Sequence, residues 1–293
     1  MARQPVISIG MPVFNASRTL ADSVASILQQ DYTDWELLIL DDGSTDGTAE
    51  LARSFADPRI RVLADGRNRG LAARLNEAVG LSRGEYFARM DGDDIAYPQR
   101  LARQLEYLRQ HPEVDLVGGW ALIFDSEFSV RGRRMTPESH AAICAAPWSG
   151  FPLLHPTFMA KKAWFVRFPY DESLGKAQDQ VLLAHACNAG RFANVQEIVL
   201  AYREDLPTLG KLWASRRCML RGMFRAYMAQ GRSAWAWRVV LAQGIRMLAD
   251  LLASLPALRA RQLGRRSVPM AAGDEQGWQA LLSRLHDAGS PRA

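Results

Sequence analysis

Residues 85–94 read EYFARMDGDD, and they join a short apolar run to a dense group of carboxylates. Residues 86–88 are typical of a buried strand, and Asp91, Asp93 and Asp94 follow closely after it. A strand that ends in acidic residues places charged oxygens at the carboxyl end of a sheet, where open α/β folds bind their ligands. The stretch therefore predicts an α/β protein with a ligand site after this strand.

The acidic group also has the composition of a metal site. Asp91 and Asp93 are two residues apart, so in extended chain they project to the same side. Two hard oxygen ligands on one side suit Mg²⁺ or Mn²⁺ bridged to the phosphates of a substrate. A solvated acidic turn would carry the same letters, but this group adjoins an apolar strand and precedes Pro98, a residue suited to the first turn of a helix. We therefore favour a divalent-metal site.

Strand and helix patterns alternate on both sides of this stretch. Apolar runs typical of buried strands occupy residues 6–11, 35–40, 60–63, 86–88, 114–117 and 121–124. Helical patterns occupy residues 17–29, 71–81 and 98–110, and another helix starts near residue 45. We expect the first strand to end at Pro12 and Ser17 to cap the first helix. The alternation predicts βαβ units and a mostly parallel sheet with right-handed crossovers.

The composition is that of an ordinary globular chain, with 293 residues of which 48% are apolar and 23% are charged. Three widely spaced cysteines without a CxxC pair favour a reduced, cytosolic protein, and we expect neither a signal peptide nor a membrane span. No GxGxxG follows the first strand and no GxxxxGK[ST] occurs, which argues against dinucleotide-binding enzymes and P-loop NTPases.

Several motifs, taken in order, resemble the family 2 glycosyltransferases, which have the GT-A fold and usually invert the anomeric centre. The resemblance covers about residues 6–203, and its closest counterparts make bacterial surface polysaccharides. The motifs are MPVFN at 11–15, LDDGSTD at 40–46, NRGLA at 68–72, RGEY at 83–86, ARMDGDD at 88–94, Pro98 with Arg100-Leu101, and HPT at 155–157. The resemblance implies a GT-A, Rossmann-like sheet flanked by helices, with a helical C-terminal extension.

On the nucleotide side, the resemblance implies that Pro12 and Phe14 line the pocket, with Phe14 offering a flat face to the base. Asp42 would accept a hydrogen bond from the uracil imide N–H, and Asn68 would lie near the base. Simpler roles stay open for these residues. Pro12 could only end a strand, Asp42 could belong to a turn, and Asn68 could mark a helix entry.

At the acidic group, the resemblance implies that Asp91 faces the ribose or sugar hydroxyls. Asp93 would hold Mg²⁺ or Mn²⁺ on the diphosphate. The divalent ion would neutralise the charge that develops on the leaving nucleoside diphosphate.

The resemblance also implies a catalytic base, which would take the proton of the acceptor hydroxyl. In the family this base is the Asp of a Glu-Asp pair that opens a helix, commonly followed two residues later by another Asp. Here Asp179 is in place, but Gln178 replaces the Glu and Val181 the later Asp. Gln178 could still donate a hydrogen bond that orients a neighbour, and Asp179 could instead be a helix N-terminal residue stabilised by the dipole. His155 would lie in the acceptor half without being catalytic.

The resemblance thus implies an inverting transfer from a nucleotide-diphosphate sugar, with a UDP-sugar expected and a hexosyl or N-acetylhexosaminyl group moved. The acceptor would be a hydroxyl of a glycan or lipid-linked acceptor in cell-surface polysaccharide synthesis. A non-catalytic nucleotide-sugar-binding relative or assembly scaffold is the alternative, because Gln178 and Val181 depart from the pattern. A sugar-1-phosphate nucleotidylyltransferase should open with a Gly-rich loop containing a basic residue, which this chain lacks.

The charge distribution divides the chain near residue 205. From residue 206 onward there are 14 Lys and Arg against 4 Asp and Glu, whereas acidic residues are in excess before it. We expect a catalytic domain at 1–205, with a nucleotide-sugar half at about 1–97 and an acceptor half at about 98–205. A basic amphipathic helical tail would occupy 206–293, with a flexible join at 264–273 and a last short helix at 278–285.

The tail contains a long apolar helix with a narrow polar stripe. Gln243, Arg246, Asp250 and Ser254 recur at helical spacing, and most other positions of residues 234–255 are apolar. So broad an apolar arc must be covered by the catalytic domain, by a partner such as a second copy, or by a bilayer. We expect Trp235 and Trp237 to suit the headgroup region, and the protein to be peripheral on the cytoplasmic membrane face. No recognised module accompanies the charge, so we expect no nucleic-acid partner.

Overall fold

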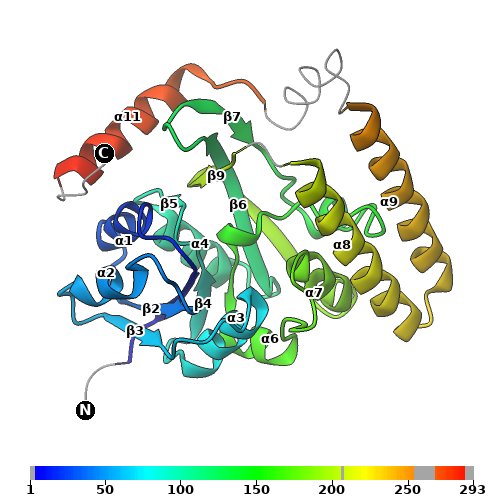
Figure 1. Cartoon of the computed structure of the whole chain (residues 1–293), viewed down its shortest axis with the longest axis horizontal. Coiled ribbons are helices and arrows are strands. Elements are labelled where there is room, and N and C mark those ends of the chain that lie inside the picture. The colour runs from blue at the N-terminus through cyan, green and yellow to red at the C-terminus, as the bar shows by residue number, and fades with distance from the viewer. Residues whose placement is uncertain (1–3, 206–207, 254–267, 288–293) are drawn as a thin grey trace.

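The computed structural model describes residues 4–205, 208–253 and 268–287 (Figure 1). Nine strands form one sheet with the order β3-β2-β1-β4-β8-β6-β9-β5, and β7 pairs with β6. The strands in chain order are β1 (Ile7–Val13), β2 (Trp35–Asp41), β3 (Ile60–Ala64), β4 (Tyr86–Arg89), β5 (Ile95–Ala96), β6 (Leu116–Phe124), β7 (Val130–Arg134), β8 (Met159–Lys161) and β9 (Phe192–Arg203). The predicted α/β class with a helical C-terminal part is confirmed.

Helices cover both faces of the sheet. They are α1 (Leu20–Leu28), α2 (Thr48–Ser54), α3 (Leu71–Leu81), α4 (Arg100–Gln110), α5 (His140–Ile143), α6 (Lys162–Arg167) and α7 (Gln178–Ala186). The short 3₁₀ helix η1 (His155–Thr157) precedes β8. In the described residues of the C-terminal part the helices are α8 (Leu209–Ala229), α9 (Ser233–Ala253) and α11 (Ala272–Asp287).

The first four strands pair in parallel, as predicted, because a crossover helix separates each from the next. The expectation of a mostly parallel sheet is wrong for the second half of the chain. β8 is antiparallel to β4 and to β6, and β5 is antiparallel to β9. Among the described strands of that half, β6 and β9 form the parallel pair. Short apolar runs do not record strand direction, so the pattern could not reveal this mixture.

Alternation along the strands divides the core into two layers. Leu38 and Leu40 point to one face, in a core layer shared with α3, α6 and α7. Leu37 and Ile39 point to the other face, toward α1 and α4. All four side chains are fully buried. Burial on both faces is why the run WELLIL is apolar throughout rather than alternating.

Three predicted boundaries are wrong. β1 continues through Pro12 to Val13, because β4 pairs with β1 only as far as Gly10, so the missing N–H of Pro12 interrupts no ladder bond on that side. The separate strands predicted at 114–117 and 121–124 form one strand, β6, whose register with β9 shifts on both sides of Trp120. Helix α1 begins after Thr19 rather than at Ser17.

The C-terminal helices pack on two separate regions of the sheet domain (Figure 1). Met223 and Tyr227 of α8 join the core layer of α7, whereas Trp278 and Leu285 of α11 pack with Phe124 at the far end of β6. Helix α11 contains the last helix predicted from sequence. Residues 206–207 at the predicted domain boundary and residues 264–267 of the predicted join lie outside the described residues.

Candidate active site

Three loops meet at the carboxyl ends of β1, β2 and β4. Chain order reverses between β1 and β4, since β2 and β3 lie on one side of β1 and β4 on the other. Open α/β sheets bind ligands at such a switch point. Gly92 brings the acidic loop against β1, because a Cβ there would lie 2.6 Å from Cγ1 of Val13. The hydroxyl of Thr19 also donates to the Gly92 carbonyl over 2.8 Å.

Asp42 organises the loop that follows β2. Its Oδ1 accepts hydrogen bonds from the Arg69 N–H over 2.7 Å and from Nε of Arg74 over 2.9 Å. Its Oδ2 accepts one from the Gly70 N–H over 3.0 Å. A carboxylate offers about four acceptor positions, so one remains for a further donor. Asn68 immediately precedes these two N–H groups, and its side chain is exposed beside the loop.

The loop after β1 is held by side chains of the loop after β2. Asn15 has φ of 51°, and its Oδ1 accepts from the Thr45 N–H over 2.9 Å. The Asn15 N–H in turn donates to the Ser44 hydroxyl over 2.9 Å. The ring of Phe14 projects from this loop and is 52% exposed. Pro12 lies within β1 and is buried, so of the two residues Phe14 is the one that presents its ring to solvent.

The acidic loop brings three carboxylates together. Ligand atoms of Asp91, Asp93 and Asp94 all lie within 4.8 Å of one another. Desolvation and the charge of Asp91 raise the pKa of Asp93 to about 6. Burial and the charges of Asp93 and Asp91 raise the pKa of Asp94 well above its usual range.

These carboxylates fit a divalent cation. Oδ2 of Asp94 is buried and has no hydrogen-bond partner among the described residues. Three crowded carboxylates repel one another until a cation neutralises them, and hard oxygen ligands suit Mg²⁺ or Mn²⁺. No metal-binding role was predicted for Asp94, although its position next to Asp93 is a sequence signal that could have identified it as a ligand.

A buried cation lies beneath the acidic loop. Arg89, the last residue of β4, has a side chain that is 3% exposed and forms an ion pair with Asp91. Its Nε and Nη1 are buried and without a hydrogen-bond partner among the described residues. Arg89 also lowers the pKa of Asp179 electrostatically, although burial is the larger influence on that group. Sequence reasoning missed Arg89, because its importance depends on burial.

The predicted base lies in the first turn of α7. Ala177, with φ of 58°, is the N-cap of α7, and Asp179 is the second residue of the helix. Burial raises the pKa of the Asp179 carboxyl, and a hydrogen bond of 3.0 Å from Nε2 of Gln180 to Oδ2 opposes that rise. A raised pKa suits a carboxylate that must take up a proton. The hydrogen bond to Asp179 comes from Gln180, which also accepts from the Phe151 N–H over 2.7 Å, and an orienting role for Gln178 stays a prediction.

His155 and Tyr170 form a second buried pair at the site. Nε2 of His155 lies 2.9 Å from the Tyr170 hydroxyl. Burial, with the charge of Arg89, lowers the pKa of His155 well below its usual range, so the imidazole is neutral. Burial raises the pKa of the Tyr170 hydroxyl, the charge of Arg89 opposes that rise, and the charges of Asp179 and Asp91 add to it. Arg89 thus pairs directly with Asp91, and its charge also acts on the pKa of Asp179 and of Tyr170.

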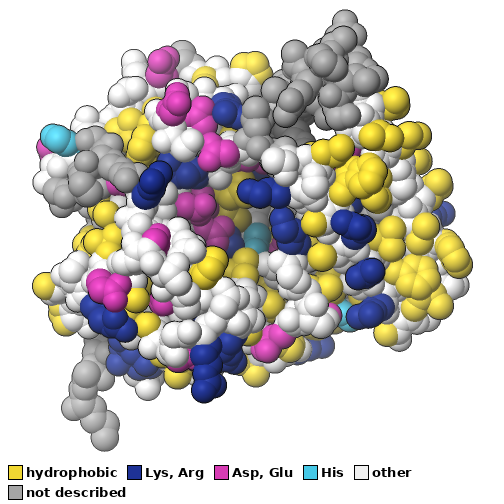
Figure 2. Space-filling view, viewed as in Figure 1, with side chains coloured by type: hydrophobic (Ala, Val, Ile, Leu, Met, Phe, Trp, Pro, Cys, Tyr) yellow, Lys and Arg dark blue, Asp and Glu magenta, His cyan; other side chains and the backbone are white. Residues whose placement is uncertain are grey.

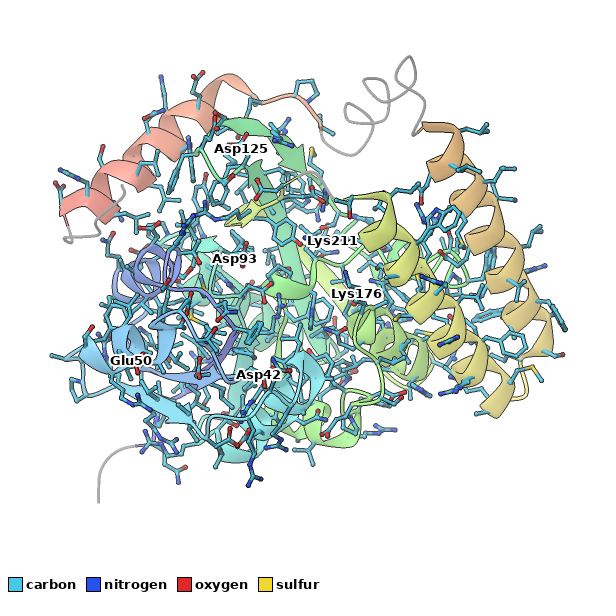
Figure 3. The ribbon with its side chains drawn as sticks, in the orientation of Figure 1. Asp42, Glu50, Asp93, Asp125, Lys176 and Lys211 are labelled. Carbon is cyan, nitrogen blue, oxygen red and sulfur yellow. The ribbon has the colours of Figure 1, made fainter. Side chains whose placement is uncertain are left out.

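The space-filling view shows acidic side chains gathered in a hollow near the centre of one face, with basic side chains across from them (Figure 2). Asp93 lies on the strand side of this open region, and Lys176 and Lys211 lie on the side of α7 and α8 (Figure 3). Asp42 lies below the acidic loop in the same view (Figure 3).

A reversed strand order with three carboxylates at its switch point is the arrangement of the GT-A class of nucleotide-sugar-binding proteins. The family model described as "Glycosyl transferase family 2" matches residues 8–195, and the chain belongs to that family.

Known proteins of similar sequence include EpsE of Bacillus subtilis strain 168, provisionally described as a glycosyltransferase. It is 37% identical over 208 residues, which cover 69% of this chain and 74% of EpsE. The second is WfgD of Escherichia coli, named UDP-Glc:alpha-D-GlcNAc-diphosphoundecaprenol beta-1,3-glucosyltransferase. It is 32% identical over 133 residues, or 45% of this chain and 52% of WfgD.

The fold is also that of a solved structure, the mannosyltransferase PcManGT of Pyrobaculum calidifontis in complex with GDP-Man and Mn²⁺. The match has a TM-score of 0.60 at 19% identity and covers 99% of this chain and 88% of the other. Because the similarity includes almost the whole chain, the C-terminal helices belong to the shared architecture.

Proposed function

We propose that this glycosyltransferase moves a hexosyl or N-acetylhexosaminyl group from a UDP-sugar to a hydroxyl group with inversion of the anomeric centre. The observation that carries the proposal is the position of Arg89. This buried cation is paired with Asp91 of the acidic loop and interacts electrostatically with Asp179 of α7. This shared cation supports a single site that contains both the donor carboxylates and the candidate base.

On the donor side, Phe14 would stack on the base and Asn68 would lie at its edge. The remaining acceptor position of Asp42 would receive the uracil imide N–H, a donor that cytosine lacks. Pro12 would support the pocket from within β1, and Asp91 would face the ribose or sugar hydroxyls. WfgD, whose name includes UDP-Glc as donor, supports a uridine nucleotide.

Asp93 would hold Mg²⁺ or Mn²⁺, with Asp94 beside it. When bound, the ion supplies Lewis-acid neutralisation of the charge on the departing diphosphate. The chain's own residues do the remaining work. Asp179 takes the proton of the acceptor hydroxyl, and Gln180 holds the Asp179 carboxylate in position. Attack from the face opposite the leaving group inverts the centre in one displacement, without a covalent intermediate.

The acceptor would be a glycan or a lipid-linked glycan used in cell-surface polysaccharide synthesis. WfgD, which acts on a diphosphoundecaprenol-linked sugar by its name, supports a lipid-linked acceptor. The protein would then work at the cytoplasmic face of the cell membrane. We also propose that catalysis belongs to residues 1–205, with the donor bound by about 1–97 and the acceptor by about 98–205.

A ligand-detected binding screen of nucleotide sugars, with and without Mg²⁺ or Mn²⁺, tests the donor assignment first. We expect UDP-sugars to bind in the presence of the ion, and one of them to be consumed when a lipid-linked sugar diphosphate is added. NMR of the product would show the inverted anomer. Binding of donor with neither transfer nor hydrolysis on any acceptor would support the non-catalytic alternative.

A further inference from the structure

Helix α9 is packed with its polar side inward. Gln243 is fully buried and Asp250 is 5% exposed, although both are polar. Nη2 of Arg216 on α8 donates to Oδ1 of Asp250 over 2.8 Å, with a second bond from Nε to the other oxygen. Arg246 donates from Nη1 and Nη2 to the Ser149 carbonyl and hydroxyl, each over 2.5 Å. These bonds fix which side of α9 faces the protein.

The opposite side of α9 is apolar and exposed. The exposed fractions are 64% for Trp237, 65% for Leu241, 60% for Ile245, 58% for Leu248 and 51% for Leu252. Their spacing of three and four residues places them in one stripe, about 22 Å long at 1.5 Å per residue. A surface helix in water has the reverse arrangement. We name these five side chains the α9 apolar stripe.

A row of arginines borders this stripe. Arg217, Arg221 and Arg225 of α8 are four residues apart and all exposed, so they share one side of that helix. Phe224 of α8 contacts Trp237 edge-on, with ring centroids 5.7 Å apart, which joins the two helices at the exposed surface. Figure 2 shows basic side chains in a row over α8, between the central hollow and the hydrophobic side chains over α9.

We infer that the α9 apolar stripe, together with the α8 arginine row, docks on an anionic lipid bilayer with α9 lying in the plane of the interface. An exposed apolar stripe with a tryptophan and flanking arginines is the composition of an interfacial helix. Within the described residues, no helix is long and apolar enough to cross a membrane. A second copy of the chain fits less well, because a symmetric pairing through this face would bring six arginines to one interface.

The structure corrects one detail of the sequence analysis. Trp235 is half-buried, whereas Trp237 is exposed. Trp235 packs inside the hairpin of α8 and α9, where its ring lies 5.5 Å from that of Tyr227 and 6.1 Å from that of Trp148. Membrane contact therefore depends on Trp237 and the residues that follow it at helical spacing.

The docking surface rests on the membrane location in the proposed function, but liposome binding tests it without any measurement of sugar transfer. The full chain is mixed with liposomes of neutral phosphatidylcholine, or of phosphatidylcholine with phosphatidylglycerol, and floated on a density gradient. We expect the protein to float with anionic liposomes at low salt and to be partly released at high salt, because the ionic attraction is screened. Full-length protein that stays at the bottom with anionic liposomes at low salt overturns the inference.

Two matched sets of variants separate the apolar and ionic contributions. The change Leu241→Gln/Ile245→Gln/Leu248→Gln should lower the partition coefficient by about 100-fold or more at every salt concentration. Leu81→Gln/Val166→Gln, at exposed apolar positions elsewhere, is the control and should leave it unchanged. Arg217→Gln/Arg221→Gln/Arg225→Gln should lower it about 100-fold at low salt only. Arg53→Gln/Arg109→Gln/Arg167→Gln is the matched charge control at other exposed positions.

Calorimetry with UDP shows whether each variant is folded, since the changed residues lie outside the donor site. Light scattering identifies the competing occupant. A stable dimer of the full chain that becomes monomeric in the Leu241→Gln/Ile245→Gln/Leu248→Gln variant, with no liposome binding by either protein, would assign the stripe to a second copy. A transferase that floats as expected but lacks activity would contradict the proposed reaction and leave the docking surface intact.

Discussion

Nε of Arg74 donates a hydrogen bond of 2.9 Å to Oδ1 of Asp42, and both side chains are almost completely buried. The same guanidinium also pairs with Asp65 and Glu77. Asp42 is thus part of the structure of the donor loop as well as a candidate reader of the base. Removing its carboxylate has two consequences, which can be measured separately.

Asp42→Ala should weaken UDP binding by about 1–3 kcal/mol, because a buried hydrogen-bond partner of the base is lost. It should also lower the free energy of unfolding by about 1–3 kcal/mol, since Arg74 and the Arg69 and Gly70 N–H groups lose their acceptor. Calorimetry and urea unfolding measure the two effects. Glu77→Gln is the control, because it removes a partner of Arg74 without touching Asp42. Equal affinity of the wild type for UDP and CDP would show that Asp42 does not read uracil.

Asp93→Ala should abolish metal-dependent nucleotide binding with little change in stability. The residue lies on a loop, and its removal relieves repulsion with Asp91 and Asp94. Titration calorimetry of UDP with and without Mn²⁺ measures this. Asp31→Ala, at an exposed acid outside the acidic loop, should behave like the wild type. Unchanged UDP affinity and metal dependence in Asp93→Ala would remove Asp93 from the metal site.

Asp179→Asn should lower kcat by about 10²–10⁴-fold, since the amide keeps the shape of the side chain but cannot accept the proton. Donor and metal binding should survive, because Asp179 lies on α7 rather than in the donor loops. Single-turnover kinetics with saturating UDP-sugar check the prediction, with Glu50→Gln as a control at an exposed carboxylate. Near-normal turnover would direct attention to another carboxylate of the acceptor half.

The raised pKa of Asp179 predicts opposite effects of pH on activity and on stability. The base must be ionised, so kcat/KM should fall as the pH drops through this raised pKa. The folded state holds the proton to higher pH than the unfolded chain, whose Asp pKa is about 3.9. This group's contribution to stability therefore declines as pH rises from that value through the folded pKa.

Asp179→Asn removes this decline and should unfold at higher urea concentration than the wild type at neutral pH. The difference should shrink as the pH is lowered toward about 4. A wild type that is more stable than Asp179→Asn at neutral pH would contradict a raised pKa for the buried carboxyl.

Arg89→Gln should lower kcat and weaken donor binding, because Asp91 loses its ion pair and the buried charge facing Asp179 disappears. Breaking a buried pair costs at most about 3–5 kcal/mol of stability, and less here because Asp91 is partly exposed. Arg89→Lys restores the charge, so it should recover part of the activity. The positioning role also requires the acid limb of the pH–rate profile to move to higher pH in Arg89→Gln. An unmoved profile in a folded variant would leave Arg89 with a structural role alone.

The sequence by itself determined the first half of the fold and most of the donor side. Continuous apolar runs showed that β1, β2 and β4 are buried on both faces, and the intervening helical patterns required parallel crossovers. Asp91, Asp93 and Asp94 could be placed together at the end of a strand, because they follow the apolar run of β4 within a few residues of one another. These features depend on residues that are close together in the sequence, so hydrophobic periodicity and turn residues are enough to predict them.

Tertiary structure alone decided the features that depend on distant residues. Arg74 and Asp42 are 32 residues apart, so their pairing could not be inferred from local patterns. Arg89 became significant only once its side chain was buried, where its charge acts on Tyr170 and on Asp179 of α7. The periodicity of α9 defined a polar and an apolar side but could not show which faces the protein. Contacts from Asp250 to Arg216 and from Arg246 to Ser149, 34 and 97 residues apart, turned the polar side inward and left the apolar side exposed.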